Sequence, residues 1–300
     1  MPRFLVINDL HAQWNGTIAA HPGYPGATIR ADWLLDELAR PGAFGGLDFV
    51  LSAGDLIHGE SLDAIASQIA ALGKRLTALP LLIHPGVGNH EIQQAEGDPA
   101  YEAPYRKAFG DRLDYLLPAG PVDLVVLCNA GCFHVTRERR EARYRFLRNA
   151  LRITPTRPKI LVCHVPLIPL RDPDVLRESF GFISYYCLDS ELLDLLDEHG
   201  QSVRLVISGH LHLTGMVERR GVRHLATAGT ASFPHDILLV DIEPNQIAVE
   251  VMSLPAALHA PSSTIHGRPR YTHDFTDPNH PDHATYLRGT PAERRFSIPL

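Results

Sequence analysis

The sequence predicts an α/β fold, because short apolar runs alternate with segments of helical periodicity through its first two thirds. The runs are rich in Val, Ile and Leu and show little polar alternation, which is typical of strands that are buried on both faces. A chain of 300 residues with 45% hydrophobic content can also enclose a large core. The predicted strands are residues 3–7, 47–52, 79–83, 122–128, 159–163 and 203–208.

The segments between these strands have the apolar spacing of helices. Their apolar side chains recur every three or four residues, so one face of each helix can pack against a sheet. The clearest stripe consists of Leu62, Ile65, Ile69 and Leu72. The predicted helices are residues 28–39, 60–76, 99–109, 138–151 and 188–198.

After Gly209 the pattern changes to consecutive strand-like segments. Short turns that contain Gly, Pro or Asn separate them, such as Arg220-Gly221 and Pro244-Asn245. This pattern predicts an antiparallel meander that closes a second sheet. The predicted strands are residues 213–219, 222–228, 236–242 and 246–252.

The composition changes again from about Pro255. Seven prolines and five histidines punctuate the rest of the chain, so we expect little regular structure there. We therefore predict a domain over residues 1–254 and a C-terminal extension over residues 255–300. An arm that lies on its own domain is the simplest interpretation. An arm that crosses to the second subunit of a homodimer, or that covers a functional site, is the alternative.

Charge and composition argue against several classes of function. The formal net charge of −6 disfavours a protein that holds the nucleic-acid backbone by bulk charge. No run approaches the roughly 18 apolar residues of a membrane-spanning helix, and the first residues lack the pattern of a secretory signal peptide. The four cysteines form no C-x-x-C pair, so we expect reduced thiols in a cytoplasmic protein that has no membrane partner.

Five of the predicted strands end in residues that commonly bind metal ions. In an open α/β sheet, ligands bind beyond the carboxyl ends of the strands, so side chains from separate strands can meet at one point. Carboxylates and imidazoles together suit Zn, Mn, Fe or Co, and the absence of cysteine from these positions disfavours a structural zinc site. The residue types therefore predict a site for two divalent cations. The candidates are Asp9, His11, Asp55, Asn89, His90, Glu91, His164, His210 and His212.

In their order along the chain these residues resemble the calcineurin-like metallophosphoesterases. The pattern of that family is D-x-H, G-D, G-N-H-[D/E], a single H and G-H-x-H, and all five blocks are present without a substituted ligand. The resemblance covers roughly residues 3–252 and does not extend to the C-terminal extension. It implies a four-layer α/β/β/α sandwich that is built on two mixed sheets.

The resemblance also implies a role for each candidate residue. Asp55 bridges the two cations, which are Mn, Fe or Zn, and a hydroxide shared by the cations attacks the phosphorus atom. His90 stays off the metals and faces the substrate as the second catalytic residue beside Asp55. The implied ligands are Asp9, His11 and His212 for one cation and Asn89, His164 and His210 for the other.

The implied activity is metal-dependent hydrolysis of a phosphate ester on a small-molecule substrate. In size and layout the chain looks most like the bacterial phosphodiesterases of this superfamily, the group that includes enzymes acting on cyclic nucleotides. A phosphomonoesterase with the same metal site is the main alternative, because the motifs handle only the phosphoryl group. Nuclease, pyrophosphatase and phospholipid-headgroup activities stay open. Scaffold proteins of this fold have degraded metal sites, so the intact ligand set disfavours a non-enzymatic role.

Substrate contacts are expected from loops near the metal ligands. Asn89 and His90 belong to one motif, and His58 follows Asp55 by three residues. His235 lies in a loop between two predicted strands and is expected to line the substrate pocket. For His58 the alternative is a solvated loop histidine.

Four further features are less specific. Asn129 is a candidate for the rim of the site, and His84 is expected to pack at a strand end. Tyr185 and Tyr186 either form an aromatic wall for a flat group or pack in the core. The arginine-rich segment 138–151 is either a solvated helix face or a surface for an anionic substrate or partner.

Overall fold

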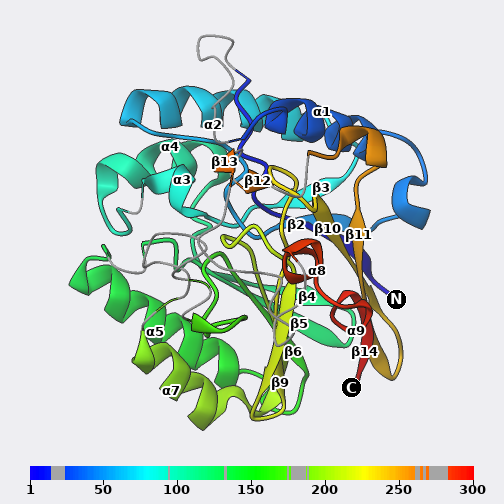
Figure 1. Cartoon of the computed structure of the whole chain (residues 1–300). Coiled ribbons are helices and arrows are strands. Elements are labelled where there is room, and N and C mark those ends of the chain that lie inside the picture. The colour runs from blue at the N-terminus through cyan, green and yellow to red at the C-terminus, as the bar shows by residue number, and fades with distance from the viewer. Residues whose placement is uncertain are drawn as a thin grey trace.

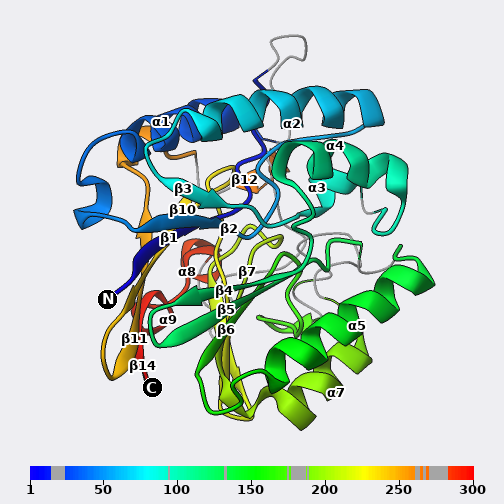
Figure 2. The same ribbon diagram turned by 180° about the vertical axis from the view of Figure 1, so that it is seen from behind.

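Two six-stranded sheets are stacked face to face in the computed structural model, and helices cover the outer face of each sheet (Figures 1 and 2). This arrangement confirms the predicted four-layer α/β/β/α sandwich. Tyr185 and Tyr186 lie outside the described residues, so their expected roles stay predictions. The structure describes residues 1–14, 24–93, 95–131, 134–173, 176, 187, 189–260, 264–265, 268–269 and 283–300.

The first sheet has the strand order β14-β11-β10-β1-β2-β3. Strands β1, β2 and β3 are parallel, whereas β10, β11 and β14 pair in antiparallel fashion. Helices lie on its outer side (Figure 1). The strands are β1 (Arg3–Ile7), β2 (Phe49–Ser52), β3 (Leu82–His84), β10 (Asp236–Ile242), β11 (Gln246–Ser253) and β14 (Arg295–Pro299). The helices are α1 (Ala27–Leu38), α2 (Leu62–Thr77), α3 (Asn89–Ile92) and α4 (Pro99–Phe109).

The second sheet has the strand order β4-β5-β6-β7-β9-β8. Its four inner strands are parallel to one another, and the two edge strands are antiparallel to their neighbours. Helices α5 (Arg137–Arg152) and α7 (Ser190–His199) cover its outer face (Figure 2). The strands are β4 (Tyr115–Ala119), β5 (Val122–Leu127), β6 (Lys159–Cys163), β7 (Val203–Ser208), β8 (Gly215–Arg219) and β9 (Val222–Ala226).

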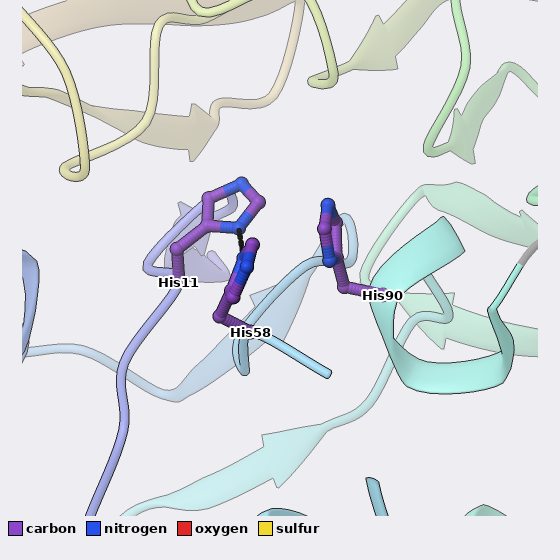
Figure 3. A group of neighbouring side chains, drawn as sticks. All are labelled: His11, His58 and His90. Atoms are coloured by element: carbon purple, nitrogen blue, oxygen red, sulfur yellow. Dashed lines mark hydrogen bonds between the residues drawn. The ribbon is translucent and has the colours of Figure 1, made fainter. Parts of the chain in front are cut away.

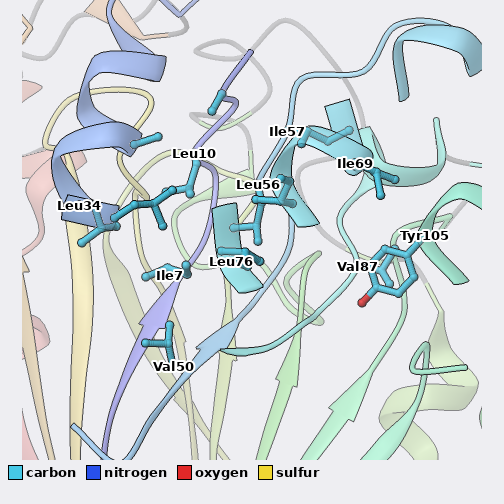
Figure 4. Close-up of a cluster of buried hydrophobic side chains, with 14 of the residues drawn as sticks. Ile7, Leu10, Leu34, Val50, Leu56, Ile57, Ile69, Leu76, Val87 and Tyr105 are labelled. Carbon is cyan, nitrogen blue, oxygen red and sulfur yellow. The ribbon is translucent and has the colours of Figure 1, made fainter. Parts of the chain in front are cut away.

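Strand β1 shows why the apolar runs have no polar alternation. Its Phe4 and Val6 face the layer between the two sheets, whereas Leu5 and Ile7 face the helices. Both layers are filled with apolar side chains, so every residue from Phe4 to Ile7 is fully buried. Figure 4 shows the helix-side layer, in which Ile7 and Val50 from the strands lie near Leu34 of α1 and Leu76 of α2.

The predicted meander is wrong, because its four strands divide between the two sheets. Strands β8 and β9 form a hairpin in the second sheet, where β9 runs parallel to β7. Strands β10 and β11 form a hairpin in the first sheet, where β10 is antiparallel to β1. Residues 227–235 cross between the sheets. Apolar periodicity predicted the strands correctly, but it carries no information about which strand each one pairs with.

The expectation of little regular structure after Pro255 is also wrong for the end of the chain. Strand β14 extends the first sheet along β11, and Arg294 forms a bidentate ion pair with Asp236 at 2.8 and 3.0 Å. Proline is tolerated here because Pro291 occupies the first turn of a helix and Pro299 ends a strand. The division at residue 254 stays a prediction. The remaining elements are α8 (His283–Arg288), α9 (Pro291–Arg294), β12 (Thr264–Ile265), β13 (Arg268–Pro269) and the 3₁₀ turns Ala43–Gly45, Gly200–Ser202 and Ala256–Leu258.

The cysteines differ from the expectation of four reduced thiols. Cys128 and Cys163 are free and buried, but Cys187 is disulfide-bonded. Cys132 lies outside the described residues. The prediction of a cytoplasmic protein therefore loses the support of its cysteines. Among the described helices, none combines the length and the apolar character that crossing a membrane requires.

His224, on strand β9 of the second sheet, has a buried side chain that can take up a proton. It is 4% exposed, and within the part of the chain that the structure describes its Nδ1 has no hydrogen-bond partner. Burial, with a smaller contribution from Arg219, lowers the pKa of His224 from 6.5 to about 4. Between pH 6.5 and pH 4, His224 is therefore protonated in the unfolded chain but neutral in the folded chain.

We predict that the protein loses stability as the pH falls from 6.5 towards 4. His224→Leu should flatten this part of the pH profile, by about 3 kcal/mol at most, because leucine takes up no proton. Unfolding in urea at several pH values measures the effect. His199→Leu at the end of α7 is the control and should keep the wild-type profile. An unchanged acid limb in the His224 variant would contradict the prediction.

Candidate metal centre

The predicted ligands converge beyond the carboxyl ends of parallel strands from both sheets. Asp9 and His11 follow β1, Asp55 follows β2, and His164 follows β6. Asn89 and His90 begin the short helix α3 after β3, and His210 and His212 follow β7. Separate strands thus deliver their last polar side chains to one point, as the sequence predicted.

Five of these residues have a left-handed backbone. The φ angles are 47° at Asp9, 43° at His11, 53° at Asp55, 71° at His210 and 52° at His212. Each such residue costs about 1 to 3 kcal/mol, and these conformations cluster at functional sites. The chain therefore turns sharply after the strands and directs each side chain back towards the centre.

Asp9, His11 and His212 form the first donor group. The Nε2 atoms of His11 and His212 lie 3.1 Å apart, and Asp9 Oδ1 lies 3.7 and 3.4 Å from them. All three side chains are at most 2% exposed. Asp9 Oδ1 is buried and has no hydrogen-bond partner among the described residues, so it presents an anionic oxygen to two imidazole nitrogens. This donor set fits a divalent cation.

Asp55, His164 and His210 form the second donor group, and Asn89 completes it. Asn89 Oδ1 lies 3.0 Å from His164 Nε2 and 2.9 Å from His210 Nδ1. Asp55 Oδ2 lies 3.2 Å from His164 Nε2 in this group and 3.6 Å from His11 Nε2 in the first group. One carboxylate oxygen is therefore shared by the two groups.

Backbone and side-chain acceptors orient the imidazole rings. His164 Nδ1 lies 2.9 Å from the carbonyl oxygen of Ala53, and His212 Nδ1 lies 2.9 Å from Ser232 Oγ. The Ala53 carbonyl can only accept, so His164 donates its Nδ1 proton and directs Nε2 to the centre; His212 has the same tautomer when Ser232 Oγ accepts from its Nδ1. Such partners fix the tautomer of a metal-binding histidine.

Charge interactions inside the site shift the pKa values strongly. Burial alone would raise the pKa of Asp9 and Asp55, but neighbouring histidines hold both far below the usual range. Burial lowers the pKa of His11. Burial opposes protonation of His164 as well, yet Asp55 raises the pKa of His164 to about 9. The carboxylates stay anionic and stabilise positive charge between them, which is a condition for binding cations.

Close backbone approach explains two glycines of the motifs. A Cβ atom on Gly88 would overlap the side chain and backbone of Asp55, and a Cβ on Gly209 would overlap Asp9 Oδ2 and Asn8. These contacts bring the loops after β3 and β7 directly against the carboxylates.

Glu91 is a residue whose function the sequence did not indicate beyond its place in the motif. It is 1% exposed, and its carboxylate accepts four backbone N–H groups. Oε1 accepts from Leu56 and Ile57 at 2.7 and 3.3 Å, and Oε2 accepts from Asp55 and Gly88 at 2.9 and 2.7 Å. Glu91 therefore joins the loop that carries Asp55 to the loop that carries Asn89.

His90 lies beside the donor groups. Its backbone N–H donates to Asp55 Oδ1 at 2.8 Å, and its Nδ1 lies 3.3 Å from the carbonyl oxygen of Gly59. The ring stands edge-on to His11 with centroids 4.7 Å apart. His90 and His210 are partly exposed, whereas the other predicted ligands are buried, so the site opens to solvent at these two residues.

The two further expected substrate contacts have different surroundings. His58 is 4% exposed and lies against His11, so the alternative of a solvated loop histidine is wrong, whereas its contact with substrate stays a prediction (Figure 3). His235 is fully buried, with Nδ1 2.8 Å from the carbonyl oxygen of Thr230 and Nε2 accepting from the Ala260 N–H. Both ring nitrogens of His235 are thus used by the backbone, so the expected contact with substrate does not fit this geometry.

The less specific candidates have structural surroundings. Asn129 is fully buried and exchanges two hydrogen bonds with the backbone of Val165, so it is not a rim residue. His84 packs edge-on against Phe49 at a strand end, which agrees with its expected role in packing.

Two residues near the site were not identified from the sequence. Tyr24 stacks on His11 with centroids 4.1 Å apart and an interplanar angle of 10°. Arg30 is 4% exposed and donates to four carbonyl oxygens, at Pro25, Thr230, Ala231 and Leu258. It fastens the segment before α1 to the loop between β9 and β10. Only the fold brings these segments together, so no local pattern could have identified either residue.

Comparisons with known proteins agree with this geometry. A family model described as calcineurin-like phosphoesterase matches residues 2–213. No curated protein matches the chain.

Several solved structures are similar to the chain. A dimetal phosphatase from Danio rerio has a TM-score of 0.62 and 15% identity, with 83% of this chain and 95% of that chain covered. The purple acid phosphatase PPD1 from yellow lupin seeds has a TM-score of 0.61 and 12% identity, with 84% and 51% covered. GAP50, the anchor in the inner membrane complex of Plasmodium, has a TM-score of 0.53 and 14% identity, with 98% and 99% covered. At these identities the likeness shows the fold alone.

We predict that Glu91→Gln destabilises the protein by about 2 to 6 kcal/mol, because an amide has one acceptor oxygen and leaves at least two buried N–H groups unpaired. Urea unfolding measures the loss. Glu138→Gln, on the exposed side of α5, is the control and should be neutral. Wild-type stability of the Glu91 variant would show that its carboxylate does not hold the two loops.

Proposed function

Because the chain belongs to the calcineurin-like phosphoesterase family, we propose that it is a phosphodiesterase that hydrolyses a small-molecule phosphate ester at a dinuclear metal centre. The family uses such a centre and consists of phosphoester hydrolases. The observation that carries the proposal is the position of Asp55 Oδ2, which lies within 3.6 Å of nitrogen donors in both groups. A single carboxylate between two donor sets is the geometry that a pair of cations needs.

The proposed ligands follow from the two groups. Asp9, His11 and His212 bind one cation, Asn89, His164 and His210 bind the other, and Asp55 bridges them. The donors are nitrogen and oxygen, which suits Mn, Fe or Zn.

Two divalent cations held there would acidify a water molecule and neutralise charge on the phosphoryl oxygens. The chain supplies the positioning. Asp55 fixes the distance between the donor groups, and its Oδ1 accepts from the backbone of His90. With the Nδ1–H of His90 donated to the Gly59 carbonyl oxygen, the ring in its imidazolium form can donate its Nε2 proton to the leaving oxygen of the ester. Asn89 directs its Oδ1 toward His164 and His210, and its contact with substrate stays a prediction from the motif.

The charge of the centre favours a diester. A phosphodiester has one negative charge, whereas a monoester has up to two at neutral pH, so cationic side chains beside the centre would favour the monoester. Among the described residues, no Lys or Arg forms an ion pair with Asp9 or Asp55, and histidines are their only charged partners. The net charge of −6 further favours a small substrate over nucleic acid or an anionic membrane.

A phosphomonoesterase with the same ligands is the second candidate, since the similar structures include proteins named as phosphatases. A scaffold role is the non-enzymatic candidate, because GAP50 is named as an anchor. The complete donor set in this chain argues against that role. Cytoplasmic localisation and a homodimer stay predictions from the sequence.

We predict that the purified protein binds two divalent cations per chain and hydrolyses bis(4-nitrophenyl) phosphate faster than 4-nitrophenyl phosphate. Elemental analysis and a colorimetric assay with Mn²⁺, Zn²⁺ and Fe²⁺ measure both properties. Removal of the cations with a chelator should abolish the activity, and their return should restore it. A preference for the monoester would favour the phosphatase, whereas absence of metal and activity would favour the scaffold.

We predict that His90→Ala keeps both cations and lowers kcat by about 10² to 10⁴, the usual contribution of a positioned proton donor. Metal content and steady-state kinetics measure the two properties in the same preparation. His199→Ala, which is remote from the centre, should retain wild-type kinetics. If the His90 variant loses a cation, the residue is a ligand and its role as proton donor is rejected.

A further inference from the structure

His58 lies directly behind the predicted ligand His11. The two Nδ1 atoms are 3.3 Å apart, and the rings point toward one another in Figure 3. The other nitrogen of His58, Nε2, lies 3.1 Å from Glu60 Oε1. His58 is buried, whereas the side chain of Glu60 is 67% exposed. A line of polar groups therefore runs from the surface to the metal centre.

Binding of a cation by His11 would fix the hydrogen atoms along this line. Nε2 of His11 faces the donor groups, 3.1 Å from His212 Nε2 and 3.6 Å from Asp55 Oδ2. If Nε2 holds a cation through its lone pair, the proton of the neutral His11 ring is on Nδ1 and can be donated to Nδ1 of His58. The proton of His58 is then on Nε2 and is donated to the carboxylate of Glu60.

The backbone fixes the distance between the two histidines. Residues 11 and 12 pair with residues 55–58 through three hydrogen bonds: His11 N–H to the Asp55 carbonyl, Ala12 N–H to Leu56, and His58 N–H to Ala12. Gly59 follows at a position where a Cβ would overlap Ile65 and the backbone of His90. His58 is therefore held in place by its chain neighbours as well as by Glu60.

Resting on the proposed function, we infer that His58, held by Glu60, is a positioning residue that orients His11 and keeps its Nε2 as the coordinating atom. A carboxylate–histidine pair behind a metal-binding imidazole fixes its tautomer and raises its basicity. This role replaces the expected contact of His58 with substrate.

A third cation site is the competing interpretation of the same residues. One ligand atom from each of His11, His58 and His90 lies within 4.8 Å of the others. A cation bound between the Nδ1 atoms of His11 and His58 would need the lone pair of His11 Nδ1, which carries a proton in the proposed arrangement. The two interpretations therefore exclude each other and differ in metal stoichiometry.

The test is titration of the metal-free protein with Mn²⁺ and, separately, with Co²⁺, whose visible absorption reports the ligand geometry. We expect two equivalents in the wild type. His58→Phe should weaken one of the two sites by 10- to 100-fold, the usual loss when such a partner is removed, and should change the Co²⁺ spectrum. His58→Gln, which offers an amide oxygen to His11 Nδ1, should recover part of the affinity and the wild-type spectrum.

Glu60→Gln provides a second test, because its exposed side chain can be changed without disturbing the core. It should weaken the same site less than His58→Phe does. The matched control is Glu198→Gln, since Glu198 is 69% exposed and lies 3.6 Å from His199 in a similar surface pair. Its affinity and spectrum should equal those of the wild type. If circular dichroism shows that His58→Phe does not fold, the metal affinity and Co²⁺ spectrum of Glu60→Gln test the inference instead.

Three results would overturn the inference. Unchanged affinity and spectrum in His58→Phe and Glu60→Gln would show that His11 needs no partner. Reduced kcat or raised KM with unchanged metal binding would return His58 to the substrate. A third cation site would be identified if the wild type bound three equivalents of Mn²⁺ and His58→Phe bound two. Failure of the wild type to bind two cations would instead contradict the proposed function, and this inference with it.

Discussion

The carboxylate of Glu91 is the interaction on which the rest of the candidate centre depends. Strands β2 and β3 end at Ser52 and His84, so the loops that follow them are not joined by the backbone hydrogen bonds of the sheet. Glu91 supplies the missing connection by accepting N–H groups from both loops. Burial raises the pKa of Glu91 to about 7, and the backbone donors offset part of the cost of the buried charge. Together with the hydrogen bond from the His90 N–H to Asp55 Oδ1, this side chain sets the positions of Asp55 and Asn89 relative to each other.

Backbone pairing and hydrogen bonds also hold other donors of the centre in position. The left-handed turns at Asp9 and Asp55 are strained, and they persist because neighbouring segments over-determine them through backbone pairing and the absence of a Cβ at glycine. Hydrogen bonds to Ala53 and Ser232 orient two of the imidazoles. These contacts position the donors, and the buried Oδ1 of Asp9, which has no hydrogen-bond partner within the described part of the chain, fits a site for positive charge.

The fold and the donor set could be predicted because their signals are local. A strand buried on both faces must be apolar throughout, and a metal motif that follows a strand stays next to it in space. The predictions from the sequence were wrong where contacts between distant segments determine how strands pair. The division of β8–β11 between two sheets depends on the crossing at residues 227–235, and β14 joins the first sheet through pairing with β11 and an ion pair between Arg294 and Asp236.

The sequence by itself determined the apolar strands, the helical faces and the order of the ligand motifs, because each depends on residues that are close together in the chain. Only the tertiary structure decided what each buried polar group contacts. His58 and His235 have the same side chain and similar burial, yet one lies behind a donor of the metal centre and the other ties Thr230 to Ala260. The reason is that a buried polar group takes its role from whichever partner satisfies it, and folding alone supplies that partner.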